Sequence, residues 1–329
     1  MRAVVVAEPG GPEQLHVEER RDPQAGDGEV LIRVAAAGVN RADLLQRMGF
    51  YPPPPGASDI LGLEASGVIV AIGAGVAGLS IGDTVMALLE GGGYAELAAV
   101  RATQVVHVPD NIDLIDAGGI PEVFITAHDA MFTRGRLGRG ETVLIHGGGG
   151  GVGTAAIQLA RLHGCRVIVT AGSAAKLARC AELGANDGID YKTEDFVART
   201  RELTDGRGAD LVLDIMGASY LERNLDVVAS DGRIVVIGMM GGTRADIDLG
   251  VMMRRRVTLI STALRARPAD QKAVIVAAFA TDVVPALAAG TLRPVIDRTF
   301  PLDEAGEAHR LMDAGDSVGK IVLVPTPRA

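Results

Sequence analysis

The pattern of apolar and polar positions changes near residue 123. Before that point, short apolar or alternating runs are separated by glycine and proline at close intervals, which is typical of strands joined by turns. After it, strand-like apolar runs alternate with stretches of helical periodicity, which predicts a parallel sheet with helices on both faces and right-handed crossovers. The sequence therefore predicts a compact β-barrel or folded sheet, followed by an α/β layer. The strands expected in the first part are 3–8, 29–39, 65–73, 83–88 and 94–100.

Capping residues indicate where the elements of the second part begin and end. A helix is expected over Val152–His163, with Gly164 just past its end. Ser173 is expected to cap the next helix, and Gly184 is expected to end it. The final apolar run, 319–324, is a strand that can return to complete the first domain. The other strands are expected at 142–146, 166–170, 187–190, 209–215, 233–238 and 257–262, and two more helices at 268–289 and 303–314.

The chain has 329 residues, which is more than one hydrophobic core usually supports, so two domains are expected. We expect one domain over 1–122, completed by 266–329, and an α/β domain over 123–265. Within the first domain, Asp43–Met48 have the pattern of one or two helical turns, and Pro52–Pro55 predict a stiff extended loop.

Composition excludes several classes of function. The net charge is −9, aromatic residues are 3% and tryptophan is absent, which disfavours nucleic acid as a partner. Only Cys165 and Cys180 are present, so neither a disulfide framework nor a four-cysteine zinc site is expected. The N-terminus lacks the apolar core of a signal peptide, and no apolar run looks long enough to span a bilayer. A cytoplasmic protein without a membrane partner is therefore expected.

Five consecutive glycines stand at the predicted junction between strand 142–146 and the following helix. One register places Gly148, Gly150 and Gly153 in the spacing of a dinucleotide-binding fingerprint. In that fingerprint the first glycine allows the turn, the second lets backbone N–H groups approach a pyrophosphate, and the third lets helix and strand pack closely. The helix N-terminus adds a positive dipole end for the phosphates. The sequence therefore predicts a Rossmann-type nucleotide site.

The end of the second predicted strand favours NADPH over NADH. NAD sites usually carry Asp or Glu there, bonded to the ribose 2′-hydroxyl, whereas this chain has Ala171, Gly172 and Ser173. Ser173 can donate a hydrogen bond to a 2′-phosphate, and Lys176 can supply a positive charge. The alternative for Lys176 is an ordinary solvent-facing lysine. Tyr191, after the third strand, can close the adenine side.

A barrel-like domain followed by a nucleotide domain resembles the medium-chain dehydrogenase/reductase superfamily, with a GroES-like catalytic domain and a Rossmann domain. The zinc alcohol dehydrogenases of that superfamily carry a cysteine in "GxCxxD" and a histidine in "GHE". The matching stretches here read "GVNRAD" and "GLEASG", so Asn40 and Leu63 stand at the two ligand positions. Glu64 remains, but one carboxylate is not a tetrahedral zinc site. We therefore expect no metal and no zinc-dependent alcohol oxidation.

Several stretches narrow the resemblance to the zinc-independent NADPH:quinone oxidoreductases related to zeta-crystallin, and within them to the tumour-suppressor-inducible branch. They are "NRADLLQRMGFYPPPPGASDILGLEASG", "IPEVFITAHDAM", "HGGGGGVGTAAIQLA", "TAGSAAK" and "VGKIVL", and they span the whole length. Most relatives carry Ser or Ala within the glycine run, whereas Gly149–Gly151 are all glycine here. Any hydroxyl contact that relatives make from that loop is absent.

The resemblance implies a role for individual residues. Asn40, Asp43 and Tyr51 would line the substrate site near the nicotinamide, with Asn40 donating to the developing oxyanion. From the residues alone, Asn40 and Asp43 could instead cap a short helix, Tyr51 could pack on the prolines, and the glycines near 241 could form a turn. The cofactor-binding residues implied are Thr126, Gly148, Gly150, Gly151, Val152, Gly153, Gly172, Ser173, Lys176, Tyr191, Gly238, Met240, Gly241, Gly242, Leu264, Arg265 and Ser317.

The function implied is direct hydride transfer from NADPH to a small quinone without metal or flavin, in which catalysis is mainly positioning. One rival is an NADPH-dependent enoyl or enone reductase of the same superfamily. Another is an NADPH-binding regulator without enzymatic activity, and a third is one-electron rather than two-electron reduction. The strand 257–262 is expected at the edge of the nucleotide sheet, where the resemblance implies pairing with a second copy in a homodimer.

Overall fold

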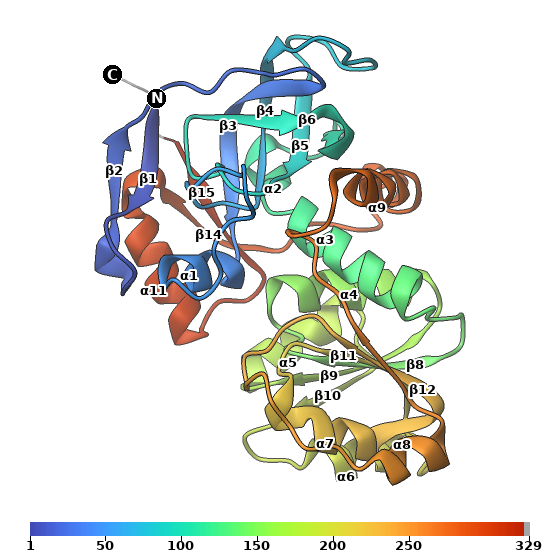
Figure 1. Ribbon diagram of the computed structural model, residues 1–329. Coiled ribbons are helices and arrows are strands. Elements are labelled where there is room, and N and C mark those ends of the chain that lie inside the picture. Colours follow the sequence, from blue (N-terminus) through green and yellow to red (C-terminus); the bar gives the residue numbers. More distant parts are fainter. Residues whose placement is uncertain (326–329) are drawn as a thin grey trace. The chain divides into compact units, whose positions relative to one another are not determined.

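The computed structural model describes residues 1–325 and divides into two units (Figure 1). The first unit comprises Met1–Ile125 and the chain from Leu264 onward, and the second comprises Thr126–Ala263. The C-terminal strand β15 (Lys320–Val324) pairs antiparallel with β3 (Glu29–Val39). The prediction that the last apolar run returns to the first domain is therefore confirmed.

A six-stranded parallel sheet forms the centre of the second unit, in the order β10-β9-β8-β11-β12-β13. From the central strand β8, strands β9 and β10 follow toward one edge of the sheet. Strands β11, β12 and β13 follow toward the other edge, which is the Rossmann order. This confirms the predicted fold class and places β13 at the expected edge. The strands are β8 (Thr142–His146), β9 (Arg166–Ala171), β10 (Asp187–Asp190), β11 (Ala209–Asp214), β12 (Val228–Val236) and β13 (Thr258–Ser261).

Helices cover the faces of this sheet (Figure 1). On one face, Leu144, Ile168 and Val212 of the strands pack with Phe196 and Leu225 of the helices. The predicted caps are confirmed: the Ser173 hydroxyl accepts from the N–H of Lys176, and Gly184 ends the same helix in the left-handed conformation. The elements are the π-helix η3 (Asp129–Arg134), α4 (Gly151–Leu162), α5 (Ala174–Leu183), α6 (Phe196–Leu203), α7 (Ala218–Val227) and α8 (Leu249–Arg255). Helix α3 (Pro121–His128) begins in the first unit, and its last residues belong to the second.

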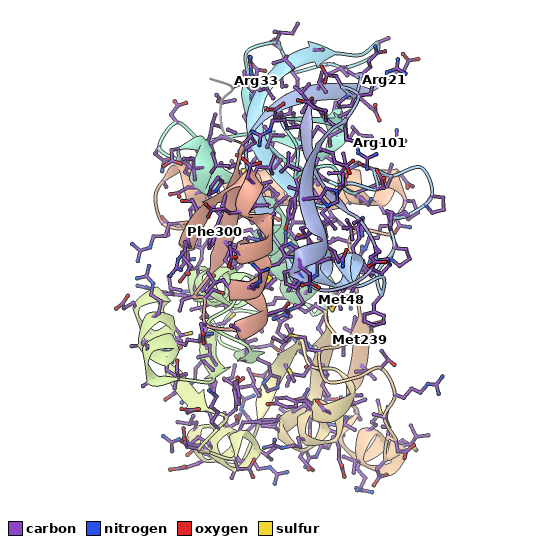
Figure 2. The ribbon with its side chains drawn as sticks, turned by 90° about the vertical axis from the view of Figure 1, so that its left-hand side faces the viewer. Arg21, Arg33, Met48, Arg101, Met239 and Phe300 are labelled. Carbon is purple, nitrogen blue, oxygen red and sulfur yellow. The ribbon has the colours of Figure 1, made fainter. Side chains whose placement is uncertain are left out.

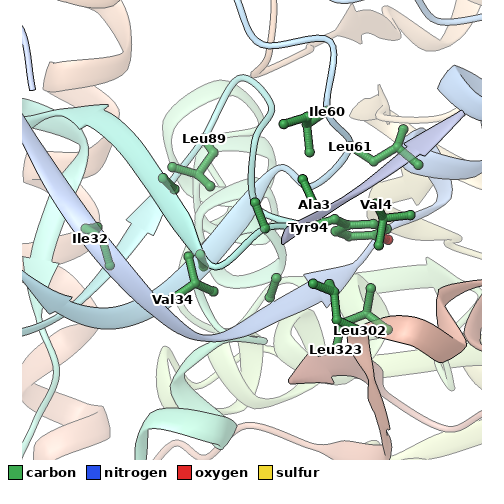
Figure 3. Close-up of a cluster of buried hydrophobic side chains, with 14 of the residues drawn as sticks. Ala3, Val4, Ile32, Val34, Ile60, Leu61, Leu89, Tyr94, Leu302 and Leu323 are labelled. Atoms are coloured by element: carbon green, nitrogen blue, oxygen red, sulfur yellow. The ribbon is translucent and has the colours of Figure 1, made fainter. Parts of the chain in front are cut away.

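The first unit contains a seven-stranded sheet and a separate hairpin of β1 and β2. Every pair in the larger sheet is antiparallel except β14 with β15. Tyr94 lies in the core between them, with its ring beside Val4 and close to Leu302 and Leu323 (Figure 3). The strands are β1 (Arg2–Val6), β2 (Leu15–Glu19), β3, β4 (Glu64–Ile72), β5 (Thr84–Leu88), β6 (Leu97–Arg101), β7 (Val105–His107), β14 (Ile296–Pro301) and β15.

The helices of the first unit surround this core. The short helix α1 (Arg41–Arg47) confirms the turns expected in that stretch; Met48 ends it (Figure 2). An ion pair between Arg41 of α1 and Asp313 of α11 (Ala305–Ala314) connects the two helices. The other helical elements are η1 (Pro12–Gln14), η2 (Ala102–Gln104), α2 (Leu114–Ala117), α9 (Ala269–Asp282), α10 (Val284–Ala288) and η4 (Leu302–Glu304).

One expectation about apolar runs is wrong. The segment Ala269–Ala288 is long and apolar enough to cross a membrane by length and composition, and 33% of that window is buried inside the protein. Its buried side includes Ile275, Val276 and Phe279. Lys272, which is 1% exposed, pairs with Glu90 on the loop after β5. Asp270, Lys272 and Asp282 interrupt the apolar run and make it look shorter in the sequence.

Candidate active site

The glycine-rich loop after β8 is closed tightly around its own backbone. A Cβ atom at Gly153 would lie 2.3 Å from the carbonyl oxygen of Gly147, and one at Gly148 would lie 2.8 Å from Cβ of Val169. At Gly150 the nearest atom would be 3.4 Å away, so packing does not require glycine at this position. Gly150 is also the N-cap of α4, where Gly151 and Val152 present the first N–H groups of the helix. The loop has the geometry that a pyrophosphate requires.

The end of β9 gathers polar groups around Gly172. The Tyr191 hydroxyl lies where a side chain at Gly172 would be, 2.5 Å from the position of a Cβ atom, and Lys192 Cε is 3.1 Å from the same position. Because the Ser173 oxygen already accepts from the N–H of Lys176, its hydrogen can be donated outward. The carbon atoms of Lys176 pack over Gly149. Two lysines and two hydroxyls thus lie where NAD sites have a carboxylate, which fits a 2′-phosphate.

Lys192 is a residue that the sequence reasoning missed. The sequence gives little sign of this role beyond the position of Lys192 directly after Tyr191. The side chain reaches Gly172 only because the chain turns after β10. In that turn, the N–H of Lys192 donates to the Asp190 carboxylate and the N–H of Asp190 donates to Glu194.

The loop after β12 carries the next group of expected cofactor residues. The N–H of Met240 donates to the carbonyl of Ile215, and the N–H of Gly241 donates to that of Met216. A Cβ atom at Gly241 would lie 1.8 Å from the Ser219 hydroxyl oxygen, so only glycine fits. Met239 projects from the same loop and is 60% exposed (Figure 2). The loop, which also contains Gly238 and Gly242, is therefore fixed to the start of α7 rather than being a free turn.

In the first unit, Asn40 belongs to a buried polar cluster. Its side-chain amide donates to Glu64 Oε1 at 2.9 Å and to the carbonyl of Gly38 at 3.3 Å, and its carbonyl oxygen accepts from Lys320 Nζ at 2.7 Å. Lys320 Nζ also lies 2.7 Å from Glu64 Oε1. Both amide hydrogens of Asn40 are thus engaged inside the protein, which argues against the expectation that Asn40 donates to a substrate oxygen. Asn40 instead holds the buried charges in place.

Asp43 supports this cluster from α1. Its carboxylate accepts from the backbone N–H groups of Asn40 at 2.8 Å and Gly62 at 3.0 Å, so the capping interpretation of Asp43 describes its contacts. Tyr94 donates its hydroxyl to the same carboxylate at 3.2 Å. Burial raises the pKa of Asp43 to about 6, although these donors and Lys320 act against the shift. Asp43 is 0% exposed, so it positions its neighbours rather than meeting a ligand.

A chain of hydrogen bonds extends from Asp43 to the surface of α11. Arg47 donates to Nδ1 of His309, so Nε2 of that ring carries the hydrogen and donates to the Tyr94 oxygen at 3.1 Å. Burial, followed by the charges of Arg47 and Arg41, lowers the pKa of His309 to about 3. Arg47 is itself paired with Asp313. The bonds from Arg47 through His309 and Tyr94 are all donated toward Asp43, which orients its carboxylate.

Tyr51 and Arg265 form a second part of the cluster. The guanidinium carbon of Arg265 lies 5.4 Å from the centre of the Tyr51 ring, and its NH1 donates to the Tyr51 carbonyl at 3.3 Å. Its Nε donates to the carbonyl of Glu90. Arg265 is 5% exposed, and its NH2 atom has no hydrogen-bond partner in the described chain. An orphaned donor on a buried cation is the feature that an oxygen atom of a bound ligand would satisfy.

Glu122, at the start of α3, was not among the expected site residues. Its backbone N–H donates to Glu64 Oε2 at 2.8 Å, which joins α3 to the buried cluster. Its side chain is partly exposed, and no hydrogen bond or ion pair engages its carboxyl group within residues 1–325. Burial of the carboxyl group, and then the charge of Glu64, raise the pKa of Glu122 to about 8. Thr126, an expected cofactor residue, follows one turn later on the same side of α3.

The structure places the expected residues in two sets. In the first unit Asn40 contacts Asp43, and Tyr51 contacts Arg265. Leu264 is buried beside Arg265, and Ser317 lies partly exposed before β15. The second unit holds the glycine loop, the Gly172 region and the loop after β12. No group of three His, Cys, Asp or Glu side chains within residues 1–325 could hold a metal ion. Leu63, at one zinc-ligand position, is buried and apolar.

Family comparisons match both units. The description "Alcohol dehydrogenase GroES-like domain" matches residues 26–110, and "Zinc-binding dehydrogenase" matches residues 151–280. The quinone oxidoreductase of Pseudomonas aeruginosa is 33% identical over 97% of its own length and 96% of this chain. A phenolphthiocerol/phthiocerol polyketide synthase protein of Mycobacterium tuberculosis is also 33% identical over 97% of this chain, which spans only 14% of that protein.

Solved structures agree over the whole chain. The Escherichia coli quinone oxidoreductase complexed with NADPH has a TM-score of 0.89 and 26% identity, and the alignment covers 99% of this chain and 100% of that one. The apo form of the JamJ enoyl reductase has a TM-score of 0.89 and 28% identity, with 99% of each chain covered. Quinone oxidoreductases and enoyl reductases are thus similar to this chain to about the same degree.

Proposed function

We propose that this chain, which belongs to the medium-chain dehydrogenase/reductase superfamily, is an NADPH-dependent quinone reductase. It is an NAD(P)-dependent oxidoreductase of that superfamily. The observation that carries the choice of NADPH is the group of Ser173, Lys176 and Lys192 at the end of β9, in place of the carboxylate of an NAD site. When bound, NADPH would supply a hydride to the substrate.

The residues of the second unit would hold the nucleotide by its phosphates. The N–H groups at the start of α4 would bind the pyrophosphate, with Gly150 leaving room for its approach. Lys176 and Lys192 would bind the 2′-phosphate as point charges, and the Ser173 hydroxyl would add a hydrogen bond. Tyr191, which is 46% exposed, would cover the adenine side.

The residues of the first unit would bind a flat, neutral acceptor. The Tyr51 ring is partly exposed and provides an aromatic surface for stacking, while the Arg265 guanidinium fixes its position. Asn40 and Leu63 stand at the zinc-ligand positions, so the chemistry of the donor set does not fit a metal that would bind an alcohol oxygen. These features favour reduction of a conjugated carbonyl, where the hydride produces a delocalised anion.

The second candidate is reduction of an enone or enoyl thioester. The similarity to the JamJ enoyl reductase and to a polyketide synthase favours it. Both reactions place negative charge on a conjugated oxygen, so the same residues can serve either. The acceptor that is actually turned over decides between them.

Titration of the purified protein with NADPH and NADH, followed by nucleotide fluorescence, tests the cofactor. The acceptor is tested by following absorbance at about 340 nm after addition of 9,10-phenanthrenequinone, 1,4-benzoquinone or a small α,β-unsaturated ketone. The proposal requires tighter binding of NADPH than of NADH and faster turnover with quinones. Turnover with enones alone would select the second candidate, and binding without any turnover would remove both.

We also propose that the protein is a homodimer formed through the edge of the six-stranded sheet. In β13, Thr258, Leu259 and Ser261 are exposed, and Leu249 and Met253 of α8 expose 67% and 78% of their surface nearby. An open edge with apolar neighbours favours pairing with a second copy. Sedimentation velocity of the wild type and of Leu259→Lys tests this, because a charge on the edge should give monomers.

A further inference from the structure

Protonation of the reduced acceptor is the step that the residues described so far leave open. Hydride addition to a quinone or an enone leaves one negative charge on the acceptor oxygen. In the buried cluster of the first unit, the Asn40 amide donates both hydrogens to protein atoms, and Lys320 is engaged by Glu64, Asn40 and the carbonyl of Val39. If a group of the protein supplies the proton for the acceptor, it has to be another residue.

Glu122 has the position that such a donor requires. It is tied to the cluster through its backbone N–H, which donates to Glu64, so α3 holds it in a fixed place. Glu122 is a partly exposed residue whose carboxyl group has no hydrogen bond or ion pair within residues 1–325, whereas Asp43 and Glu64 are both 0% exposed. Of Asp43, Glu64 and Glu122, only Glu122 is partly exposed, and its backbone is held by Glu64.

The charges around Glu122 favour its neutral, protonated form. Glu64 of β4 and Asp43 of α1 face it with negative charge, whereas Lys320 of β15 and Arg265 oppose them. Burial is the largest influence, and together these effects raise the pKa of Glu122 to about 8. Arg265, whose charge acts on Glu122, holds an NH2 atom that has no hydrogen-bond partner in the described chain. Burial raises the pKa of the Tyr51 phenol, an ionised Glu122 would raise it further, and Arg265 acts against the shift, so Tyr51 is coupled to both residues.

We infer, on the basis of the proposed function, that Glu122 is the proton donor of the reaction and that the Arg265 NH2 group binds the acceptor oxygen that receives the proton. The O–H bond of the Glu122 carboxylic acid breaks as a new O–H bond forms on the acceptor oxygen. The acceptor, having gained a hydride and a proton, leaves as a hydroquinone or an enol, and the Glu122 carboxylate regains its proton from water. The hydride comes from the nicotinamide cofactor, so charges and electrons balance.

The direction of this transfer is favourable. A phenolate product has a conjugate acid of pKa about 10, as in tyrosine, so it takes a proton readily from an acid of lower pKa. An ordinary glutamate, with a pKa near 4.3, would already be ionised at neutral pH and would have no proton to give. The environment of Glu122 thus matches the pKa of the donor to the operating pH, which is the condition for efficient acid catalysis.

The first test follows the carboxyl group itself and needs neither cofactor nor turnover. Infrared difference spectra of the wild type minus Glu122→Gln, recorded from pH 6 to pH 10, should contain a protonated carboxyl band that is lost near pH 8. Glu304→Gln, which removes an exposed glutamate of η4, is the matched control and should leave that band unchanged. A Glu122 carboxyl group that is already ionised at pH 7 would overturn the inference, whatever the acceptor is.

The second test uses the pH dependence of turnover. The kcat of the wild type should fall above about pH 8, while Glu122→Gln should lower kcat by about 10²-fold, abolish that limb and leave the Kd of NADPH unchanged. Glu122→Asp should restore the limb and part of the rate, which a merely structural role would not produce. Full turnover by Glu122→Gln with an unchanged pH profile would overturn the inference. Should the wild type reduce enones but not quinones, the quinone proposal fails and the same variants test Glu122 with the enone.

Discussion

Lys320 Nζ lies 2.7 Å from Glu64 Oε1, and the side chains of both residues are almost completely buried. The pair joins β15, near the C-terminus, to β4, and Asn40 bridges the two charges. Because a buried ion pair loses hydration on both sides, its geometry and additional hydrogen bonds decide whether it is tolerated. Here Val39 and Glu122 supply those bonds through their backbones.

Removal of one member of this pair should destabilise the protein strongly. Lys320→Met leaves the Glu64 carboxylate buried without its cation, which typically costs about 3–5 kcal/mol. The double variant with Lys320→Met and Glu64→Gln removes both charges and should recover part of that loss. Urea unfolding of the two variants and the wild type gives the comparison. Equal stability of the single and the double variant would contradict a coupled pair.

The stability of the protein should depend on pH through His309. The folded pKa of about 3 lies below the unfolded value of 6.5, so between these values the unfolded chain binds a proton that the folded chain does not. Stability from this residue is complete above pH 6.5 and is lost as the pH falls, at about 1.4 kcal/mol per pH unit. His309→Gln, whose amide can accept from Arg47 and donate to Tyr94, should remove this part of the slope.

The measurement is the free energy of unfolding of the wild type and His309→Gln at several values from pH 7 to pH 4. His146, whose pKa burial lowers to about 4, adds a slope of the same sign to both proteins. Asp43 acts in the opposite direction between pH 3.8 and about 6, because its raised pKa favours the folded state at low pH. The difference between the two proteins isolates His309, and parallel pH curves would contradict the prediction.

Two glycines of the nucleotide loop should respond differently to alanine. In Gly153→Ala the new methyl group would lie 2.3 Å from the Gly147 carbonyl oxygen, so the loop must shift and the melting temperature should fall. In Gly150→Ala the nearest atom is 3.4 Å away, so the fold should be retained while the approach of the pyrophosphate is hindered. Thermal unfolding and NADPH fluorescence titration separate these outcomes. A stable Gly153→Ala that binds NADPH normally would show that the loop is looser than the structure has it.

Lys176→Ala should reduce the preference for NADPH over NADH. A hydrogen bond to a charged group is worth about 1.5–3 kcal/mol, so the ratio of the two Kd values should change about 10- to 100-fold, with NADH binding little affected. Lys192→Ala is the matched variant on the other side of Gly172 and should give a smaller change in the same direction, because its side chain is more exposed. Unchanged ratios in both variants would place the 2′-phosphate elsewhere.

Much of the second unit could be predicted from the sequence. Its strands are continuous apolar runs, its helices have polar caps such as Ser173, and its glycines occupy a spacing that few other structures need. Helix α3 was harder because it has only 8 residues, and strand β14 was harder because charged positions interrupt the pattern of Ile296–Pro301. The short strands β2 and β7 carry too few apolar residues to stand out.

The sequence by itself determined the fold class and led to a prediction of where a nucleotide binds, because both depend on local periodicity and on glycines adjacent in the chain. Only the tertiary structure decided what surrounds Asn40. Lys320 is 280 residues away along the chain, and Glu122 belongs to an element that the sequence left unassigned. Their proximity follows from the pairing of β15 with β3 and from the contact of α3 with Glu64. Burial and neighbouring charge, which set the protonation of Glu122, exist only once those segments have come together.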